Sequence, residues 1–317
     1  MPTGYSEPIY VHDLVKIYDG DIRAVDGLEF TVHKGEIYGL LGKNGAGKTT
    51  TIRILTTLIP PTSGEALVCG LDVRHRARKI RELIGVVQQG EAFDFTTVEG
   101  NFRIYQMLWK MPRREAAEKT EMLMELFNIS HLRKKRMFEL SGGEKKRVQV
   151  AREFLHDMDV LFLDEPTVGM DPIMRRSVLD FIRKKAKEGL TVLFTTQILE
   201  EADYLCDRIG IMNHGKISAE GSASYLKNTY GEMRKVEIVL ETDLTDELKK
   251  NIEVYLSQFD SIHTFQVGDR RIEMILRNMG KVLPQFIQYM NRISVEIETI
   301  NSDNPSLDDV FLEVVKG

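Results

Sequence analysis

Between residues 42 and 49 the chain reads Gly42-Lys43-Asn44-Gly45-Ala46-Gly47-Lys48-Thr49, which matches the pattern G-x-x-x-x-G-K-[ST]. An apolar run suited to a strand, Glu36–Leu41, precedes it, and a helical run, Thr50–Leu58, follows it. Glycines let such a loop curl until its backbone N–H groups point at phosphate oxygens, and the helix N-terminus adds a positive dipole end. We expect Lys48 to bridge the β- and γ-phosphates of a nucleotide and Thr49 to bind Mg²⁺. The sequence therefore predicts a phosphate-binding loop.

The chain up to about residue 230 alternates short β-rich runs with helical patterns, which predicts an α/β fold. Several of the runs are continuously apolar, as strands covered on both faces of a sheet are. The expected strands are Glu36–Leu41, Ile84–Val87, Val160–Leu163, Thr191–Thr195 and Ile209–Met212. Residues 97–157 carry a strongly helical pattern with no convincing strand, so we expect them to form a helical insertion in the α/β core.

A change of pattern near Gly231 predicts a second domain. Alternating and helical runs follow one another between Val236 and Ile297 in the order β-α-β-β-α-β, which is the ferredoxin-like order. We therefore expect a first domain over residues 1–231 and an α+β ferredoxin-like domain over residues 232–317. The tail that follows the last strand is expected to be a short helix or an extended ending.

Composition narrows the class of protein. The 317 residues hold 43 basic and 48 acidic side chains, a net charge of −5, which argues against a dedicated nucleic-acid binder. The two cysteines, Cys69 and Cys206, form neither a disulfide framework nor a zinc motif, which favours a reduced cytosolic setting. No apolar run approaches the roughly 18–20 residues that span a bilayer, and residues 1–8 lack the order of a signal peptide. We expect a soluble protein that reaches a membrane only through a partner.

Two acids follow the expected strand Val160–Leu163. Carboxylates at the C-terminal end of a parallel strand lie at the ligand crevice of an open α/β sheet. We expect Asp164 to hold Mg²⁺ through water and Glu165 to polarise an attacking water as general base. Many strands end in acids, so this prediction depends on the phosphate-binding loop earlier in the chain.

The stretch Ser141-Gly142-Gly143 precedes the helical run Lys145–His156 and allows two interpretations. Glycines before a helix N-terminus make a second anion site of the same physical kind. Ser141, with Glu144 three residues later, also makes a capping box that simply starts the helix. The residues alone leave both interpretations open.

Taken together and in this order, the motifs resemble the nucleotide-binding subunit of ATP-binding cassette (ABC) transporters over about residues 8–230. The resemblance implies a P-loop NTPase cassette with a helical subdomain, and ATP with Mg²⁺ as its ligands. It makes Ser141-Gly142-Gly143 the family signature, which touches the γ-phosphate of ATP bound to the opposite subunit, with Glu144 where Gln is commoner. The residues expected to bind ATP in the loop are Gly42, Lys43, Asn44, Gly45, Ala46, Gly47, Lys48, Thr49 and Thr50.

The resemblance also assigns three single residues. Tyr18 matches the aromatic that stacks on adenine, with a surface tyrosine as the alternative. Gln89 matches the glutamine that meets Mg²⁺ and the lytic water and begins the segment facing the membrane partner. We choose Gln89 over Gln88 because it follows the strand Ile84–Val87 by the usual spacing of one intervening residue. Asp171 matches the loop that follows the catalytic acid and crosses the dimer interface.

Within the family, residues 195–203 and the C-terminal extension ending at residues 305–312 resemble the drug-resistance export branch of the daunorubicin-resistance type. That branch usually carries His where this chain has Gln197. A neutral Gln keeps an amide donor and an acceptor but cannot shuttle a proton. We therefore expect Gln197 to help Glu165 fix the water in a slow but working ATPase. The alternative is that Gln197 points away and Glu165 acts alone.

The resulting prediction is an ATP-hydrolysing subunit that powers a separate integral-membrane permease exporting drugs or other hydrophobic compounds. The expected partners are that permease and a second copy of the chain, in a head-to-tail dimer with two ATP at the interface, and no nucleic acid. This implies a cytoplasmic chain held at the inner face of the cell membrane through the permease. The alternatives are a soluble ABC ATPase acting on nucleic acid or ribosomes, and a ligand-sensing regulatory ATPase. The transported substrate is not readable, because the permease forms its path.

Overall fold

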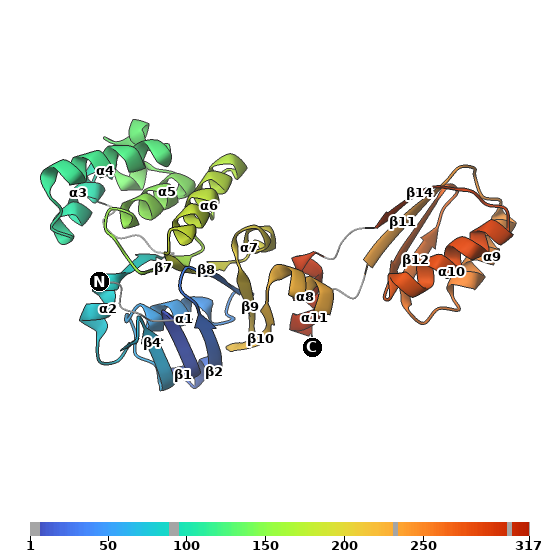
Figure 1. The fold of residues 1–317 in the computed structure, drawn as a ribbon, viewed down its shortest axis with the longest axis horizontal. Coiled ribbons are helices and arrows are strands. Elements are labelled where there is room, and N and C mark those ends of the chain that lie inside the picture. Colours follow the sequence, from blue (N-terminus) through green and yellow to red (C-terminus); the bar gives the residue numbers. More distant parts are fainter. Residues whose placement is uncertain (1–6, 89–94, 231–233, 303–305, 317) are drawn as a thin grey trace. The chain divides into compact units, whose positions relative to one another are not determined.

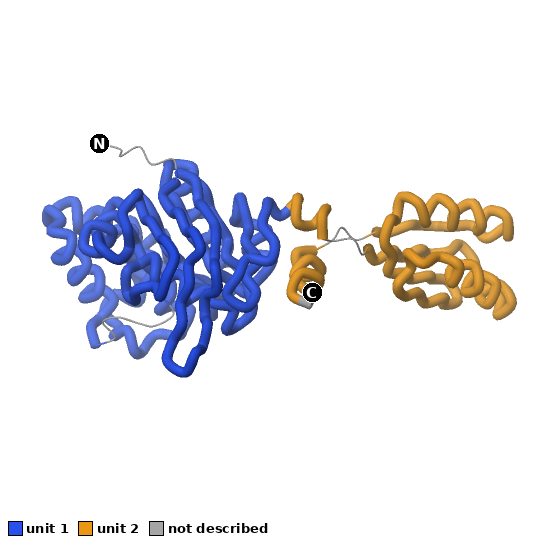
Figure 2. Tube along the Cα trace, turned by 90° about the horizontal axis from the view of Figure 1, so that it is seen from below, with its two compact units in different colours: residues 1–223 blue, residues 224–317 orange. Residues whose placement is uncertain are grey.

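The computed structural model describes residues 7–88, 95–230, 234–302 and 306–316. The chain divides into two compact units, residues 1–223 and 224–317, which Figure 2 colours blue and orange. The predicted architecture, an α/β core with a helical region and a C-terminal α+β part, is confirmed. Within the described ranges, no helix is both long and apolar enough to cross a membrane.

The centre of unit 1 is a six-stranded sheet in the order β10-β9-β3-β8-β7-β6. Neighbouring strands from β9 to β6 are parallel, and only the β10–β9 pair is antiparallel. All five strands predicted from the sequence are present, each within one residue of its expected ends. The strands are β3 Ile37–Leu41, β6 Ile84–Val87, β7 Val160–Asp164, β8 Thr191–Thr196, β9 Arg208–Asn213 and β10 Lys216–Gly221.

This sheet is covered on both faces, because consecutive side chains of a strand point to opposite sides. In β7, Val160 and Phe162 pack into one apolar cluster, and Leu161 and Leu163 pack into the other. All four side chains are fully buried. The continuous apolar runs of the sequence are therefore the result of burial on two sides, which leaves only the strand ends free to carry polar groups.

A second sheet, in the order β2-β1-β4-β5, is antiparallel, and none of its strands is among the five expected from the sequence above. Its strands mix buried and partly exposed positions, and bulges shift the β1–β2 register at several points. Such an interrupted pattern gives a weaker signal than an unbroken apolar run. The strands are β1 Ile9–Tyr18, β2 Ile22–Val32, β4 Ser63–Val68 and β5 Leu71–Asp72.

The helices of unit 1 lie on both sides of this core, with α3, α4 and α5 gathered together (Figure 1). All of residues 97–157 are described, and they form helices and turns with no strand beyond one bridge between Thr97 and Arg136. The helices are α1 Lys48–Leu55, α2 Ala77–Leu83, α3 Val98–Leu108, α4 Arg113–Leu126, α5 Gly142–Glu153, α6 Pro172–Lys187 and α7 Leu199–Leu205, with 3-10 turns at Ser130–Leu132 and Met137–Glu139.

Unit 2 contains the predicted ferredoxin-like order β11-α9-β12-β13-α10-β14, and its antiparallel sheet runs β12-β13-β11-β14. The tail expected as a short helix or an extended ending is the helix α11. The two compact units meet between residues 223 and 224, whereas the expected domain boundary at 231/232 lies outside the described residues, so that boundary stays a prediction. The elements are α8 Ala223–Tyr230, β11 Arg234–Leu240, α9 Asp246–Leu256, β12 Ile262–Val267, β13 Arg271–Leu276, α10 Met279–Arg292, β14 Ile297–Ser302 and α11 Leu307–Lys316.

A buried carboxylate attaches the end of α5 to β6. Glu153 Oε2 accepts a hydrogen bond of 3.2 Å from the backbone N–H of Val86, and Glu153 Oε1 lies 3.9 Å from Arg152 Nε. Both charged side chains are only 6% exposed. Burial raises the pKa of Glu153 to about 7, and the neighbouring Arg152 opposes that rise. The folded chain therefore holds a proton on this carboxyl at a pH where an unfolded chain has released it.

Stability should fall as pH rises through this window, because the folded state binds more protons than the unfolded state between about pH 4.5 and about pH 7. Glu153→Gln removes the titration and keeps an acceptor for Val86. Between about pH 5 and about pH 8, the free energy of unfolding of the variant should rise relative to that of wild type by up to about 3 kcal/mol. One pKa unit corresponds to about 1.4 kcal/mol. Urea unfolding of both proteins across this range measures the difference.

The control is Glu118→Gln, which removes a carboxylate whose side chain is 68% exposed on α4. Its unfolding free energy should follow the pH profile of wild type. Parallel profiles for wild type and Glu153→Gln would contradict the assignment of this titration to Glu153.

Candidate active site

The phosphate-binding loop is built where the chain leaves the buried strand β3 and starts α1. Gly47 precedes the helix with φ +110°, a left-handed conformation that side chains other than glycine rarely adopt. A Cβ on Gly47 would overlap the carbonyl oxygen of Ala24, and one on Gly42 would lie 2.6 Å from the carbonyl oxygen of Met212. The two glycines therefore let the loop curl against its neighbours at both of its ends.

Lys48 is folded back over this loop. Its ammonium group donates to the carbonyl oxygens of Gly42 at 2.6 Å and Lys43 at 3.2 Å. Burial lowers the pKa of Lys48, and the carboxylates of Glu165 and Asp164 oppose that effect. The described residues provide it with no third hydrogen bond, so one of its three N–H donors remains for a phosphate oxygen.

Thr49 and Asp164 bring two oxygen ligands together beside the loop. The Thr49 hydroxyl donates to Asp164 Oδ2 at 3.0 Å, and Asp164 Oδ1 accepts from the Thr195 hydroxyl at 2.7 Å. Within the described ranges no three His, Cys, Asp or Glu residues cluster as a metal site. A hydroxyl and one carboxylate fit Mg²⁺, which keeps water ligands and binds through few protein groups together with phosphate oxygens.

Glu165 stands at the end of β7 with φ +50°, which turns the chain sharply away from the sheet. Its backbone N–H is 3.2 Å from both the carbonyl oxygen and the hydroxyl of Thr195. Its side chain is 8% exposed, and Oε1 accepts a hydrogen bond of 2.5 Å from Gln197 Nε2. Gln197 thus points at Glu165 and not away from it.

Thr195 is a residue of this cluster that sequence reasoning missed. Its side chain binds the Asp164 carboxylate and meets the backbone of Glu165, so it holds both acids in place. The available signal was a threonine directly after the apolar run 192–194 in β8, beside the strand that carries the acids.

Ser141 and Asp171 act as helix caps in this chain. Glu144 N–H donates to the Ser141 hydroxyl at 3.3 Å, and Ser141 N–H donates to the Glu144 carboxylate at 2.8 Å, which lowers the pKa of Glu144. Asp171 Oδ1 accepts from the N–H of Met174 at 3.0 Å. Among the described residues, no hydrogen bond joins Ser141, Gly142, Gly143 or Asp171 to the loop at residues 42–49.

Of the two remaining predicted residues, one lies beside the loop and one cannot be placed. The Tyr18 hydroxyl is 3.5 Å from the Thr50 hydroxyl, and its ring is 36% exposed with Lys16 Nζ 5.3 Å from the centroid. The ring is thus available at the start of α1. Gln89 lies outside the described residues. The preceding Gln88 is held through its carbonyl oxygen, which accepts from Lys146 Nζ at 2.6 Å.

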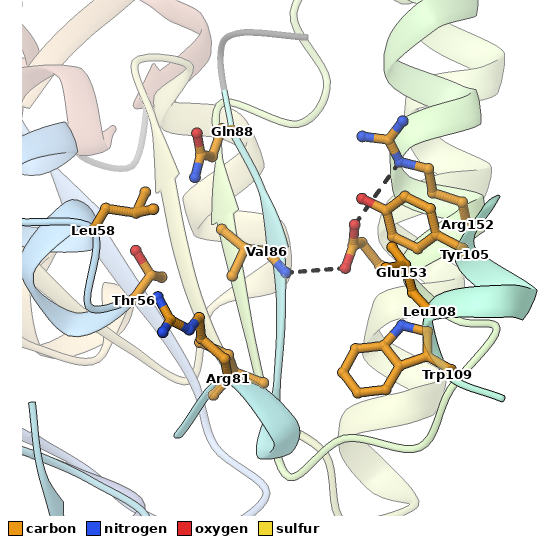
Figure 3. Close-up of a pocket in the computed structure, with 11 residues that line it drawn as sticks. Thr56, Leu58, Arg81, Val86, Gln88, Tyr105, Leu108, Trp109, Arg152 and Glu153 are labelled. Carbon is orange, nitrogen blue, oxygen red and sulfur yellow. Dashed lines mark hydrogen bonds and ion pairs between the residues drawn. The ribbon is translucent and has the colours of Figure 1, made fainter. Parts of the chain in front are cut away.

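A cavity of about 620 Å³ lies in unit 1 next to Gln88 (Figure 3). Apolar side chains from α3 face it, with the Glu153–Arg152 pair at its wall. Its lining residues are Thr56, Leu58, Arg81, Ile84, Val86, Gln88, Tyr105, Leu108, Trp109, Arg152 and Glu153. Leu58 and Leu108 are 49% and 61% exposed, so this cavity opens to solvent through apolar groups.

Comparison with known proteins assigns the family. A model of the ABC transporter family matches residues 25–168, and a model of the C-terminal domain of DrrA1-3-like ATP-binding proteins matches residues 221–315. The chain is 35% identical to the daunorubicin resistance ATP-binding protein DrrA3 of Streptomyces coeruleorubidus, over 93% of this chain and 92% of that protein. It is 37% identical to the doxorubicin resistance ATP-binding protein DrrA of Mycobacterium tuberculosis, over 96% of this chain and 92% of that protein.

Among solved structures, the ATP-binding subunit of an ABC transporter superposes with a TM-score of 0.65 at 25% identity, covering 70% of this chain and 93% of that one. The curled loop, the paired acids and the glutamine beside them agree with this assignment. The chain therefore belongs to the ABC transporter family, as an ATP-binding subunit with ATPase activity that is homologous to the DrrA drug-resistance proteins.

Proposed function

We propose that this chain hydrolyses ATP with Glu165 as general base and thereby powers the export of drugs or other hydrophobic compounds through a separate permease. The observation that carries the catalytic part is the 2.5 Å hydrogen bond from Gln197 to Glu165, next to the Lys48 loop and the Thr49–Asp164 pair. The export part is supported by the likeness to drug-resistance ATP-binding proteins over both units of the chain.

In the proposed reaction, each polar group of the site has one role. Lys48 and the loop N–H groups bind the phosphates, and Glu165 takes a proton from the water that attacks the γ-phosphorus as the bond to ADP breaks. Gln197 donates to Glu165 through its amide nitrogen, which leaves its amide oxygen to accept from the same water. Thr49, Asp164 and Gln89 would hold Mg²⁺, which would neutralise phosphate charge. Tyr18 would stack on adenine.

The site needs a second copy of the chain. Gly142 and Gly143 open α5 directly after the Ser141 cap, and the positive end of a helix dipole at such an N-terminus favours an anion. In the described part of the chain, no hydrogen bond joins these three residues to the phosphate loop of their own chain. In a head-to-tail dimer they would reach the γ-phosphate bound by the partner. Asp171, at the start of α6, would lie at that same interface.

The cavity beside Gln88 is the surface that we assign to the permease. It combines exposed apolar side chains with a position directly before Gln89, the residue expected to begin the segment facing that partner. Docking there would place this chain at the inner face of the cell membrane. Val86 of β6 and the following Gln88 are also hydrogen-bonded to α5, which begins at the Ser141 cap, so this surface is joined to the signature.

Replacing Glu165 with Gln should separate binding from chemistry. The variant keeps the loop and the Thr49–Asp164 pair but loses the base, so ATP should hold two chains together without being consumed. Size exclusion of the full chain with Mg-ATP should give a lasting dimer, whereas the double variant Glu165→Gln, Lys48→Ala should stay monomeric. A Glu165→Gln chain that hydrolyses ATP at the wild-type rate would show that Glu165 is not the base.

Changes at Gln197 should alter turnover but not nucleotide affinity. Gln197→Ala removes one hydrogen bond to a charged group and should lower kcat roughly ten-fold. Gln197→His restores a donor and should hold or raise kcat, with a new titration near about pH 6–7 that wild type lacks. Steady-state ATPase assays across pH measure both. Unchanged turnover in Gln197→Ala would mean that Glu165 acts alone.

A charge placed in the cavity should disrupt only the partner. Leu108→Asp puts a carboxylate among apolar lining groups, so less permease should co-purify with the chain from membranes while ATPase activity in solution stays unchanged. The matched control is Met107→Asp, because Met107 is the neighbouring residue, is 64% exposed, and lines a different cavity. Equal loss of the membrane partner in both variants would contradict this docking surface.

A further inference from the structure

Glu201 is an almost fully buried carboxylate, 3% exposed, at the start of α7. Its Oε1 accepts a hydrogen bond of 2.7 Å from the Thr167 hydroxyl, and its Oε2 accepts one of 2.8 Å from the Thr196 hydroxyl. Both threonines are also buried, at 1% and 2% exposed. One carboxylate therefore joins two segments that are far apart in the sequence, with a different oxygen for each.

These two segments carry the pair proposed to act on water. Thr167 lies two residues after Glu165, on the turn that leaves β7, and Thr196 immediately precedes Gln197 at the end of β8. The hydrogen bond from Gln197 to Glu165 bridges the same two segments on the solvent side. Glu201 thus ties them together from the buried side, and the distance between Gln197 and Glu165 depends on both links.

Arg175 extends the link to the loop before α6. Its Nε lies 3.3 Å from Glu201 Oε1, and its NH2 group donates to the carbonyl oxygen of Met170 at 3.4 Å. Met170 directly precedes Asp171, which is proposed to lie at the dimer interface. The position of that loop is therefore connected, through Arg175 and Glu201, to the segments that hold Glu165 and Gln197.

We propose that Glu201 is a positioning residue for ATP hydrolysis, which holds Gln197 against Glu165 and links both to the loop that the second copy contacts. The proposal rests on the proposed roles of Glu165 and Gln197. An ionised carboxylate can accept from both threonines and pair with Arg175 at once, because it has two acceptor oxygens. A glutamine has only one, so no single rotamer of Glu201→Gln reproduces all three contacts.

A purely structural role is the competing explanation. The start of α7 also has local bonds, from the Ile198 N–H to the Thr196 hydroxyl at 3.0 Å and from the Glu201 N–H to the Ile198 carbonyl oxygen at 3.1 Å. A carboxylate that only supported this turn would change stability when replaced, and its effect on turnover would be independent of Gln197. Residues that act through one another give non-additive effects, which separates the two explanations.

The test is a double-mutant cycle on the full chain, with kcat and KM for ATP measured for wild type, Glu201→Gln, Gln197→Ala and the double variant. Glu201→Gln should lower kcat about ten-fold, the scale of a lost hydrogen bond to a charged group, with KM nearly unchanged. The double variant should be no slower than Gln197→Ala. The control Glu200→Gln, at the exposed neighbouring position on α7, should turn over like wild type.

A second pair of variants tests the same hydrogen bond without replacing the buried Glu201, whose substitution could impair folding. Thr167→Val keeps the side-chain shape and removes the hydroxyl, so it should slow kcat in the same way, whereas Thr167→Ser keeps the hydroxyl and should restore most of it. Additive losses in the cycle, an unchanged kcat in Glu201→Gln, or equal kcat in the Val and Ser variants would each overturn the positioning role. Failure of the proposed function itself would give a different result, because the Glu165→Gln variant would then hydrolyse ATP at the wild-type rate.

Discussion

The structure depends on one steric constraint, the close passage of the loop at residues 42–49 between β3 and α1. No Cβ fits at Gly47 or Gly42 without overlap with neighbouring backbone oxygens, so the loop can curl only because glycines stand there. That curl starts α1 at Lys48 and turns the Lys48 ammonium back over the loop carbonyls. The backbone path itself therefore sets the shape of the loop that we propose binds phosphate.

The polar groups around the loop are arranged by the strand ends of the parallel sheet. β7 and β8 are neighbours in register, which sets Thr195 beside Asp164 and brings Gln197 to Glu165. The two carboxylates favour the charged form of Lys48, against the burial that lowers its pKa. The Lys48 ammonium and the two carboxylates therefore interact at the C-terminal ends of the buried parallel strands.

The sequence predicted those parts of the fold that rest on strong local signals. Val160–Leu163 is apolar throughout because the strand is covered on both faces, and the loop glycines have a fixed spacing. Partly exposed, bulged strands such as β1 lacked such a signal. Glu201 was missed for a related reason: it stands beside the exposed Glu200 in an acidic first helical turn, and only its spacing of four from the buried Leu205 placed it on the inner face.

The central claim is that each ATP is held by the phosphate loop of one copy and the signature of the other. Mixing two inactive variants tests it most directly: Lys48→Ala, which loses the loop cation, and Gly142→Asp, which sets a negative charge at the signature where a Cβ meets open space. Mixed dimers then contain one site with both parts intact, so ATPase activity should reappear on mixing. If each loop used the signature of its own chain, the mixture would stay as inactive as its components, and the account would be contradicted.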